Sequence, residues 1–120
     1  MSAANEFVEN LEEVFSSFGR VEARAMFGGH GLYRDGLMFA LVADDVLYLK
    51  ADQQSVQRFA DLGLAQFEYV KDGRRTRMSY WEAPESVFDD PRQAKEWAGL
   101  AYDAALRTSK GKKKGARKAD

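Results

Sequence analysis

Three residue types that often carry chemistry or constrain a fold are scarce in this sequence. Its 120 residues include no cysteine, one histidine and two prolines. Without cysteine the chain can form neither a disulfide nor a thiolate metal site, and it offers no thiolate nucleophile. With one histidine, a structural zinc ion would depend on carboxylates for nearly all of its ligands, which is rare in such sites. We therefore predict neither a metal site nor a cofactor.

Long apolar runs are absent as well. No apolar stretch approaches the ~18 residues that a membrane-spanning helix needs. The first twenty residues are acidic and amphipathic, whereas a secretory signal has a basic start followed by an apolar run. We therefore expect a soluble, cytoplasmic protein without membrane contact. The 45% of hydrophobic and 31% of charged residues are an ordinary balance for one globular domain of this length.

Positive charge is concentrated at the C-terminal end. Residues 109–120 hold six Lys or Arg and one acid, which leaves 12 basic and 18 acidic residues, a net charge of about −6, for the rest. The segment has almost no apolar side chain, so we predict a domain over residues 1–108 and a disordered basic tail over residues 109–120. The tail could hold nucleic acid by weak, nonspecific phosphate contacts, or it could only solubilise the chain end. Its basic residues are Lys110, Lys112, Lys113, Lys114, Arg117 and Lys118.

Apolar spacing and turn residues predict the first half of the fold. Apolar side chains recur every three or four residues over about residues 4–18, which favours a helix that ends at Gly19. A β region with three strands follows over about residues 21–50. Asp35-Gly36 within it is a strong hairpin signal, because a type I′ turn requires positive φ at both central positions. A regular ladder from this turn would pair Tyr33 with Met38, Leu32 with Phe39, Gly31 with Ala40, and His30 with Leu41.

The second half reads as a helix, a hairpin and a final helix. The helix covers about residues 52–62, with Asp52 or Ser55 as its cap. The hairpin turns at Asp72-Gly73 and pairs Phe67 with Met78, Glu68 with Arg77, and Tyr69 with Thr76. Asp90-Pro91 is typical of a helix start, and that helix should run to about Arg107. Its inward stripe consists of Ala94, Trp97, Ala98, Ala101, Ala104 and Ala105. We therefore predict an α+β fold, an antiparallel sheet flanked by helices in the order α-β-β-β-α-β-β-α.

The segment MFGGHGLYRDG (residues 26–36) holds four glycines and the single histidine. A glycine loop that cradles phosphate normally joins a strand to a helix N-terminus, but this one leads into another strand. We favour close packing instead. In a regular strand, Gly29 and Gly31 would share a face with Ala40 and Val42, and the small residues of the last helix could approach there. Phe27, Gly28, Gly29 and His30 remain candidates for an interaction site.

His30 does not by itself predict catalysis. General acid–base chemistry needs a second positioned group, and the sequence places none beside it. We interpret it as a partly exposed residue beside a bend, and we predict no catalytic residue. The basic run Arg74-Arg75-x-Arg77 precedes Tyr80 and Trp81, and basic residues among aromatics can hold nucleic acid strands. The acidic body favours a solvated turn there instead, with Tyr80 in the core.

Several segments together resemble the N-terminal domain of the TfoX (competence regulator) family. The resemblance covers about residues 6–107 and rests on MFGG (26–29), DG (35–36), LYLK (47–50) and MSY (78–80) followed by Pro84. It implies a bacterial protein with a compact α+β domain and an antiparallel sheet flanked by helices. It also implies a link to natural competence, in which full-length members act on transcription. Those members carry a second, C-terminal domain where this chain has its short basic segment.

The sequence therefore favours a non-enzymatic regulatory or protein-interaction module of the TfoX type. Its partner would dock through the sheet and the aromatic region around Tyr80 and Trp81, and an exposed strand edge could pair with its copy in a homodimer. The alternative is a small-molecule-binding or enzymatic domain with a pocket near Phe27–Gly31, in which His30 is a polar contact. A concave pocket of ~300 Å³ or more would favour that alternative.

Overall fold

The first apolar stripe forms α1 (Ala3–Val14) in the computed structural model, which describes residues 3–26 and 28–119 and the side chains of residues 6–26 and 28–109. The helix ends four residues before the predicted end. A turn follows, in which the Gly19 N–H donates to the Phe15 carbonyl at 3.1 Å. Two serines precede Phe18, and serine hydroxyls compete for backbone groups near helix ends. Phe15 and Phe18 are nevertheless buried, as the stripe predicts.

The β region contains four strands, one more than predicted: β1 (Glu22–Met26), β2 (Gly29–Arg34), β3 (Leu37–Ala43) and β4 (Val46–Lys50). The additional strand arises because the chain reverses between Met26 and Gly29, which pair with each other. Gly28 has a φ of 77°, a left-handed conformation that glycine adopts without strain. Phe27 lies outside the described residues. The predicted turn between β2 and β3 is confirmed, since Asp35 and Gly36 both have positive φ.

A β-bulge changes the register of β2 and β3. Tyr33 pairs with Met38 as predicted, but the register shifts after this pair, so that Leu32 faces Ala40 and not Phe39. A bulge of this kind interrupts the regular alternation of side chains between the two faces of a strand. Phe39 and Ala40 consequently both belong to the hydrophobic core, although they are consecutive residues.

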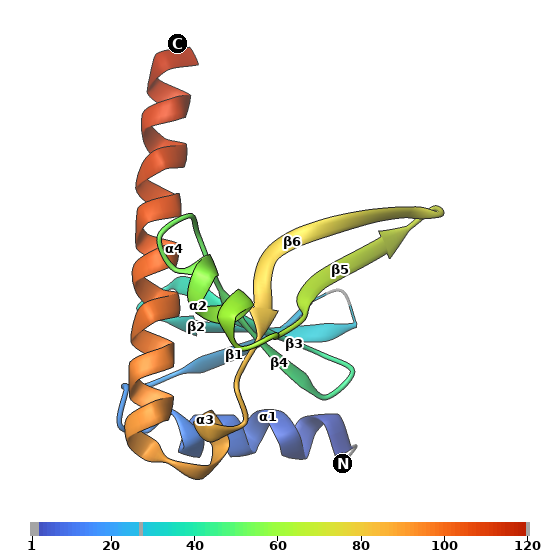
Figure 1. Cartoon of the computed structure of the whole chain (residues 1–120), viewed down its shortest axis with the longest axis vertical. Coiled ribbons are helices and arrows are strands. Elements are labelled where there is room, and N and C mark those ends of the chain that lie inside the picture. Colours follow the sequence, from blue (N-terminus) through green and yellow to red (C-terminus); the bar gives the residue numbers. More distant parts are fainter. Residues whose placement is uncertain (1–2, 27, 120) are drawn as a thin grey trace.

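The middle of the chain forms α2 (Val56–Asp61) and the hairpin of β5 (Gln66–Lys71) and β6 (Arg74–Glu82). The helix is shorter than predicted because the Asp52 carboxylate accepts hydrogen bonds from the Gln54 and Ser55 N–H groups, which makes residues 52–55 a turn. The predicted pairs Glu68–Arg77 and Tyr69–Thr76 are confirmed. The ladder is interrupted between Gln66 and Glu68, where the sequence predicts the pair of Phe67 and Met78. Figure 1 shows this hairpin projecting from the domain as an arm.

Two helices complete the chain. The short α3 (Ser86–Asp89) was not predicted, whereas α4 (Pro91–Ala119) begins where Asp90-Pro91 predicts, and the Asp90 carboxylate accepts a hydrogen bond from the Arg92 N–H at 2.9 Å. The backbone of α4 continues beyond the predicted end at about Arg107, through a segment rich in Lys, Arg and Ala, which favour helix. The side chains of residues 110–120 lie outside the described residues. The division at residue 108 and the disorder of the tail stay predictions.

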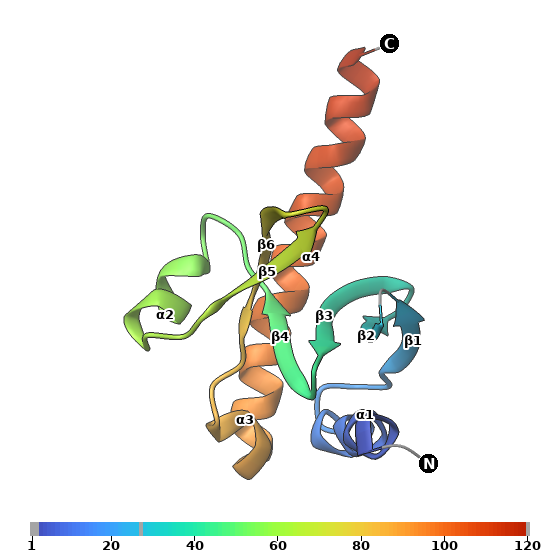
Figure 2. The ribbon, with the colours of Figure 1, turned by 90° about the vertical axis from the view of Figure 1, so that its right-hand side faces the viewer.

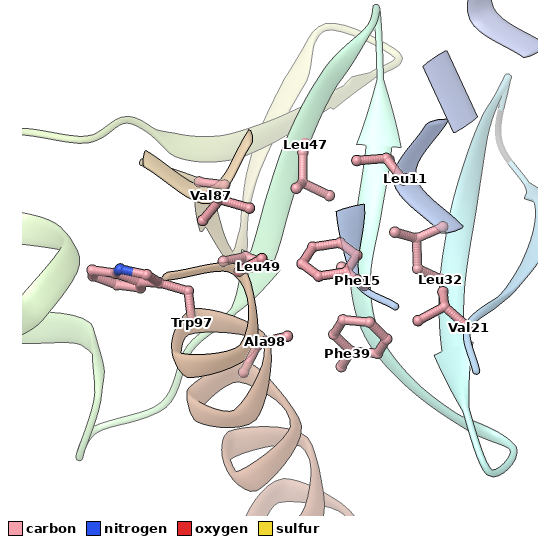
Figure 3. Packing of buried hydrophobic residues seen from close by; sticks show 14 of the residues in the cluster. Leu11, Phe15, Val21, Leu32, Phe39, Leu47, Leu49, Val87, Trp97 and Ala98 are labelled. Atoms are coloured by element: carbon pink, nitrogen blue, oxygen red, sulfur yellow. The ribbon is translucent and has the colours of Figure 1, made fainter. Parts of the chain in front are cut away.

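The six strands form one antiparallel sheet in the order β1-β2-β3-β4-β6-β5, which confirms the α+β class. Along the chain the order is α-β-β-β-β-α-β-β-α-α, which adds one strand and one helix to the prediction. The helices α1, α3 and α4 share a core with one face of this sheet, which we call the closed face. Figure 3 shows Phe15 and Phe39 side by side, with Leu49 of β4 and Ala98 of α4 near them. The predicted inward residues of α4 are all buried: Ala94, Trp97, Ala98, Ala101, Ala104 and Ala105.

Candidate functional site

The face of the sheet opposite the core, which we call the open face, holds a cavity of about 510 Å³. Figure 2 shows that strands β1 to β3 curve round and do not lie in one plane with β4. All six strands contribute to its lining, and Thr108 of α4 is also part of it. The volume lies within the range of ~300–1,000 Å³ that is typical of small-molecule sites.

Strand alternation explains which residues reach this cavity. Neighbouring residues of a strand point to opposite faces of a sheet. In β4, Leu49 belongs to the core and the next residue, Lys50, lines the cavity. In β3, the bulge moves Met38 and Leu41 to the open face on either side of two core residues.

The lining is mainly apolar and rich in methionine. Methionine side chains are flexible and polarisable, so a surface made of them can adapt to ligands of different shape. Three of them come from three different strands, and two aromatic side chains of the β5–β6 hairpin stand near them. These residues are Met26, Met38, Met78, Phe67 and Tyr69.

A small polar group lies within this apolar surface. The Lys50 ammonium donates a hydrogen bond to the Ser79 hydroxyl and lies 5.1 Å from the centre of the Tyr80 ring. Lys50 and Tyr80 are paired in register, and therefore project from the same face. The lining residues that the structure describes include this lysine but no aspartate or glutamate. The cavity is therefore suited to an apolar ligand with a negative or hydrogen-bond-accepting group.

Tyr80 is a buried phenol at this site, 8% exposed. Burial, and to a smaller extent the nearby phenol of Tyr33, raises the pKa of Tyr80 to about 12. Tyr80 is thus a neutral hydrogen-bonding group at neutral pH and does not act as a base.

The packing interpretation of the glycine cluster is wrong. A Cβ atom at Gly29 would lie 2.1 Å from the Val42 carbonyl oxygen, so it is the backbone of β3 that requires glycine there. A Cβ atom at Gly31 would lie 2.8 Å from the Met26 sulfur and 3.0 Å from the Met38 sulfur. Gly31 pairs with Leu41 and not with Ala40, which places it on the open face, away from the alanines of α4. Its missing side chain makes room for two methionines of the cavity.

The other candidates of the glycine segment are only partly brought together. Gly29 and His30 line the cavity, whereas Gly28 forms the exposed turn and Phe27 lies outside the described residues. His30 pairs with the core residue Val42 and not with Leu41, so strand alternation directs its imidazole towards the closed face. Although His30 is part of the cavity lining, its imidazole is therefore not a catalytic base that points into the cavity.

Tyr80 and Trp81 lie on opposite faces. Tyr80 lines the cavity, as described above, whereas Trp81 packs against the core and its ring centre lies 6.3 Å from that of Phe59. The pair is therefore not one exposed aromatic patch, and only Tyr80 faces the candidate site. The basic side chains predicted to contact nucleic acid, residues 110–118, lie outside the described side chains.

Sequence reasoning missed most of the cavity. Its main signal was present in the alternation of β4, where Lys50 follows the core residue Leu49. The methionines could not be assigned from the sequence, because Met26, Met38 and Met78 come together only through the curvature of the sheet.

An ion pair fastens α4 near this end of the sheet. The Arg107 guanidinium donates two hydrogen bonds to the Asp52 carboxylate, one of them from Nη2 to Oδ1 at 2.9 Å. These bonds lower the pKa of Asp52 to about 2. The next residue, Thr108, lines the cavity, so the ion pair holds part of the cavity wall in place.

The fold and the site define a class, namely an α+β domain with one helix-covered sheet face and an apolar cavity on the other. The chain belongs to the TfoX N-terminal domain family, which matches residues 13–105, more than half of its length. It is 37% identical over 82 residues to DNA transformation protein TfoX1 of Aliivibrio fischeri, covering 65% of this chain and 39% of that protein. It is 31% identical over 96 residues to Protein Sxy of Escherichia coli, covering 80% of this chain and 46% of that protein.

The chain thus matches less than half the length of each of these relatives. The predicted family is confirmed. Within the described residues, no helix is both long and apolar enough to span a membrane. A cytoplasmic location stays a prediction.

Proposed function

We propose that the chain is a non-enzymatic regulatory module that binds its effector in the cavity on the open face. The observation that carries this proposal is a 510 Å³ cavity with a mainly apolar lining and no carboxylate among the lining residues that the structure describes. Acid–base catalysis needs converging groups of suitable pKa, whereas Tyr80 is a neutral phenol and His30 is directed elsewhere. Such a site binds molecules more readily than it transforms them.

The link to competence is part of the same proposal. The relative from Aliivibrio fischeri is named for DNA transformation, and the family implies the regulation of DNA uptake. Because the matched part is less than half of that protein, this role is carried to the present chain as a hypothesis. Cavity occupancy would then change how the domain engages a protein partner.

The free edges of the sheet are the natural places for such a partner. β1 and β5 are the two outermost strands, and an outer strand presents unpaired backbone groups to another chain. A protein partner or a second copy could add a strand at either edge. Sedimentation of the purified chain at increasing concentration tests the homodimer, and a constant monomer mass would exclude it.

Binding in the cavity is tested with a neutral apolar fluorophore, N-phenyl-1-naphthylamine, whose emission rises in apolar surroundings. We expect saturable binding to the chain and its loss in Ala43→Trp, because Ala43 lines the cavity and the indole would fill it. Ala25→Trp is the matched control, since Ala25 is exposed on β1 outside the lining. Equal binding by both variants would refute the site.

The regulatory role is tested in the native bacterium. Replacing the chromosomal gene by the Ala43→Trp form should change DNA transformation frequency, and the Ala25→Trp form should not. If both forms behave like the wild type while fluorophore binding differs, the cavity binds a ligand without serving this role.

We also propose a second contact, between the basic residues of segment 109–120 and the phosphates of nucleic acid. Removing residues 109–120 should weaken binding to labelled DNA at 50 mM salt, and the difference should shrink at 200 mM salt because the contacts are electrostatic. Unchanged binding after removal would leave the segment with a solubilising role.

A further inference from the structure

Among the lining residues of the cavity that the structure describes, positive charge is present and negative charge is not. Lys50 stands among its apolar side chains, and no acidic residue is part of the described lining. Lys50 is half-buried as a residue, whereas Ser79, which its ammonium contacts, is exposed, so an anion can reach this charge from solvent. The charge is held in place, since the ammonium donates to Ser79 and lies over the Tyr80 ring.

We propose that the cavity binds a small amphipathic carboxylate, with its hydrocarbon part among the methionines and its carboxylate on Lys50. This inference rests on the proposed function of the cavity as a binding site, and it adds the chemical class of the ligand. It concerns a free small molecule, not a protein segment or a lipid surface.

Ser79 lies beside Lys50, since its hydroxyl accepts a hydrogen bond from the Lys50 ammonium. This hydroxyl can in turn donate its own hydrogen to a carboxylate oxygen, so Ser79 is a second contact for the head group. A charge-assisted hydrogen bond of this kind is about twice as strong as one between neutral groups.

The position of Lys50 in the sheet suits an amphipathic ligand. Its strand, β4, is in the middle of the sheet order, with Met26 and Met38 on strands to one side and Met78 on β6 to the other. A carboxylate on Lys50 therefore has apolar surface in both directions for the rest of the molecule.

The flexible methionines favour a hydrocarbon chain over a rigid ring system. Their side chains can follow a chain that bends, and Gly31 leaves the space that two of their sulfurs occupy. A Cβ atom at Gly31 would push the Met26 and Met38 side chains into the cavity and reduce its volume. The glycine of the MFGGHG segment thus serves the cavity and not the packing of α4.

The test uses ligands of equal chain length and different head group. Decanoate, decanol and decylamine are titrated against the chain loaded with N-phenyl-1-naphthylamine, below the concentrations at which they form micelles. We expect decanoate to displace the fluorophore at a concentration about tenfold lower than decanol, which corresponds to about 1.4 kcal/mol. Decylamine should be weaker than decanol, because its charge repels that of Lys50.

Two lysine variants test whether Lys50 causes the preference for decanoate over decanol. Lys50→Met keeps the length and apolar body of the side chain, and should abolish the preference for decanoate while leaving decanol within about twofold. Lys71→Met is the matched control at the end of β5, outside the lining, and should keep the tenfold preference. In parallel, the methyl NMR signals of Met26, Met38 and Met78 should shift on addition of decanoate.

The outcomes separate this inference from the proposed function. Equal displacement by decanoate and decanol in the wild type would overturn the carboxylate site, while fluorophore binding would still support the cavity. A preference that survives in Lys50→Met would overturn it too. Absence of any fluorophore or decanol binding would refute the proposed function itself. If Lys50→Met does not fold, the wild-type ligand series and the methionine shifts still decide the matter.

Discussion

The closed and open faces of the sheet are built by neighbouring residues of the same strands, yet they differ in almost every physical respect. On the closed face, Leu47 and Leu49 of β4 are at most 2% exposed beneath α1, α3 and α4. Between and beside them, Tyr48 and Lys50 are half-buried on the open face. The comparison shows that a residue's environment here depends on which face it occupies and on the layer that covers that face.

The largest expected effect separates two adjacent residues on the two faces. Phe39→Ala would leave a void in the core beside Phe15, whose ring centre is 5.8 Å away, and should destabilise the domain by about 3–5 kcal/mol. Met38→Ala removes a half-buried side chain on the open face and should cost about 1 kcal/mol. Urea unfolding of both variants measures the difference. Similar losses would mean that the open face is as tightly packed as the core.

Two glycine variants compare the cost of adding a methyl group beside backbone atoms with its cost beside side chains. Gly29→Ala forces a methyl group against the Val42 carbonyl oxygen, and backbone cannot move aside easily, so we expect a loss of about 1–3 kcal/mol. Gly31→Ala meets the ends of two flexible methionine side chains, which can turn away, and the Tyr33 ring at 3.1 Å, which must give by only a few tenths of an ångström. Its loss should be smaller, but it should weaken fluorophore binding in the cavity. Thermal unfolding and fluorophore titration of both variants test this order, and a greater loss for Gly31→Ala would contradict it.

The ion pair of Asp52 and Arg107 joins the helix layer to the cavity wall and should make stability depend on pH. The pKa of Asp52 is lowered from 3.8 to about 2 in the folded state. Its contribution is therefore fully present above pH 3.8 and is lost as the pH falls towards 2. We expect a contribution of about 1 kcal/mol, which is below the ~1.5–3 kcal/mol of hydrogen bonds to charged groups because the Arg107 side chain is 35% exposed.

Asp52→Asn should lose this contribution at pH 7 and show a flatter decline in acid. Asp61→Asn, at an exposed acidic residue of α2, is the control and should keep the wild-type profile. Urea unfolding at pH 7 and pH 3 measures both. Parallel acid profiles for Asp52→Asn and the wild type would show that the ion pair contributes nothing.

The smallest change in stability is expected for the β5–β6 hairpin, which projects from the domain. The Arg77 guanidinium lies 3.5 Å from the Glu68 carboxylate, but its side chain is 75% exposed. Arg77→Ala should change the free energy of unfolding by less than ~0.5 kcal/mol, because exposed ion pairs contribute little. Urea unfolding at low and high salt measures this, and a loss above 1 kcal/mol would mean that the arm is packed more firmly than its exposure indicates.

Local signals predicted much of the fold. The two Asp-Gly turns, the start of α4 at Pro91 and its buried alanine stripe are confirmed, because each depends on residues close together in the chain. The short α3 and the late start of α2 at Val56 were missed. In the latter, Asp52 bonds to nearby N–H groups and to Arg107, 55 residues away, and the sequence shows no sign of that partner.

The candidate site was predicted only in outline. A pocket near the glycine segment was the alternative hypothesis, and Gly29 and His30 do line the cavity. The bulge between Leu32 and Tyr33 then changed the faces expected for His30 and Gly31. A shift of one residue moves every following side chain to the other side of a strand, so register errors of this size alter a site completely.

The sequence by itself determined the family, the antiparallel α+β class and the residues that alternate along each strand, since these depend on local propensity and spacing. Only the tertiary structure decided which set of alternating residues the helices cover and which set encloses a cavity. The physical reason is that the curvature of the sheet brings Met26, Met38 and Met78 together from separate strands. Contacts between residues so far apart in the chain leave no periodic signal in the sequence.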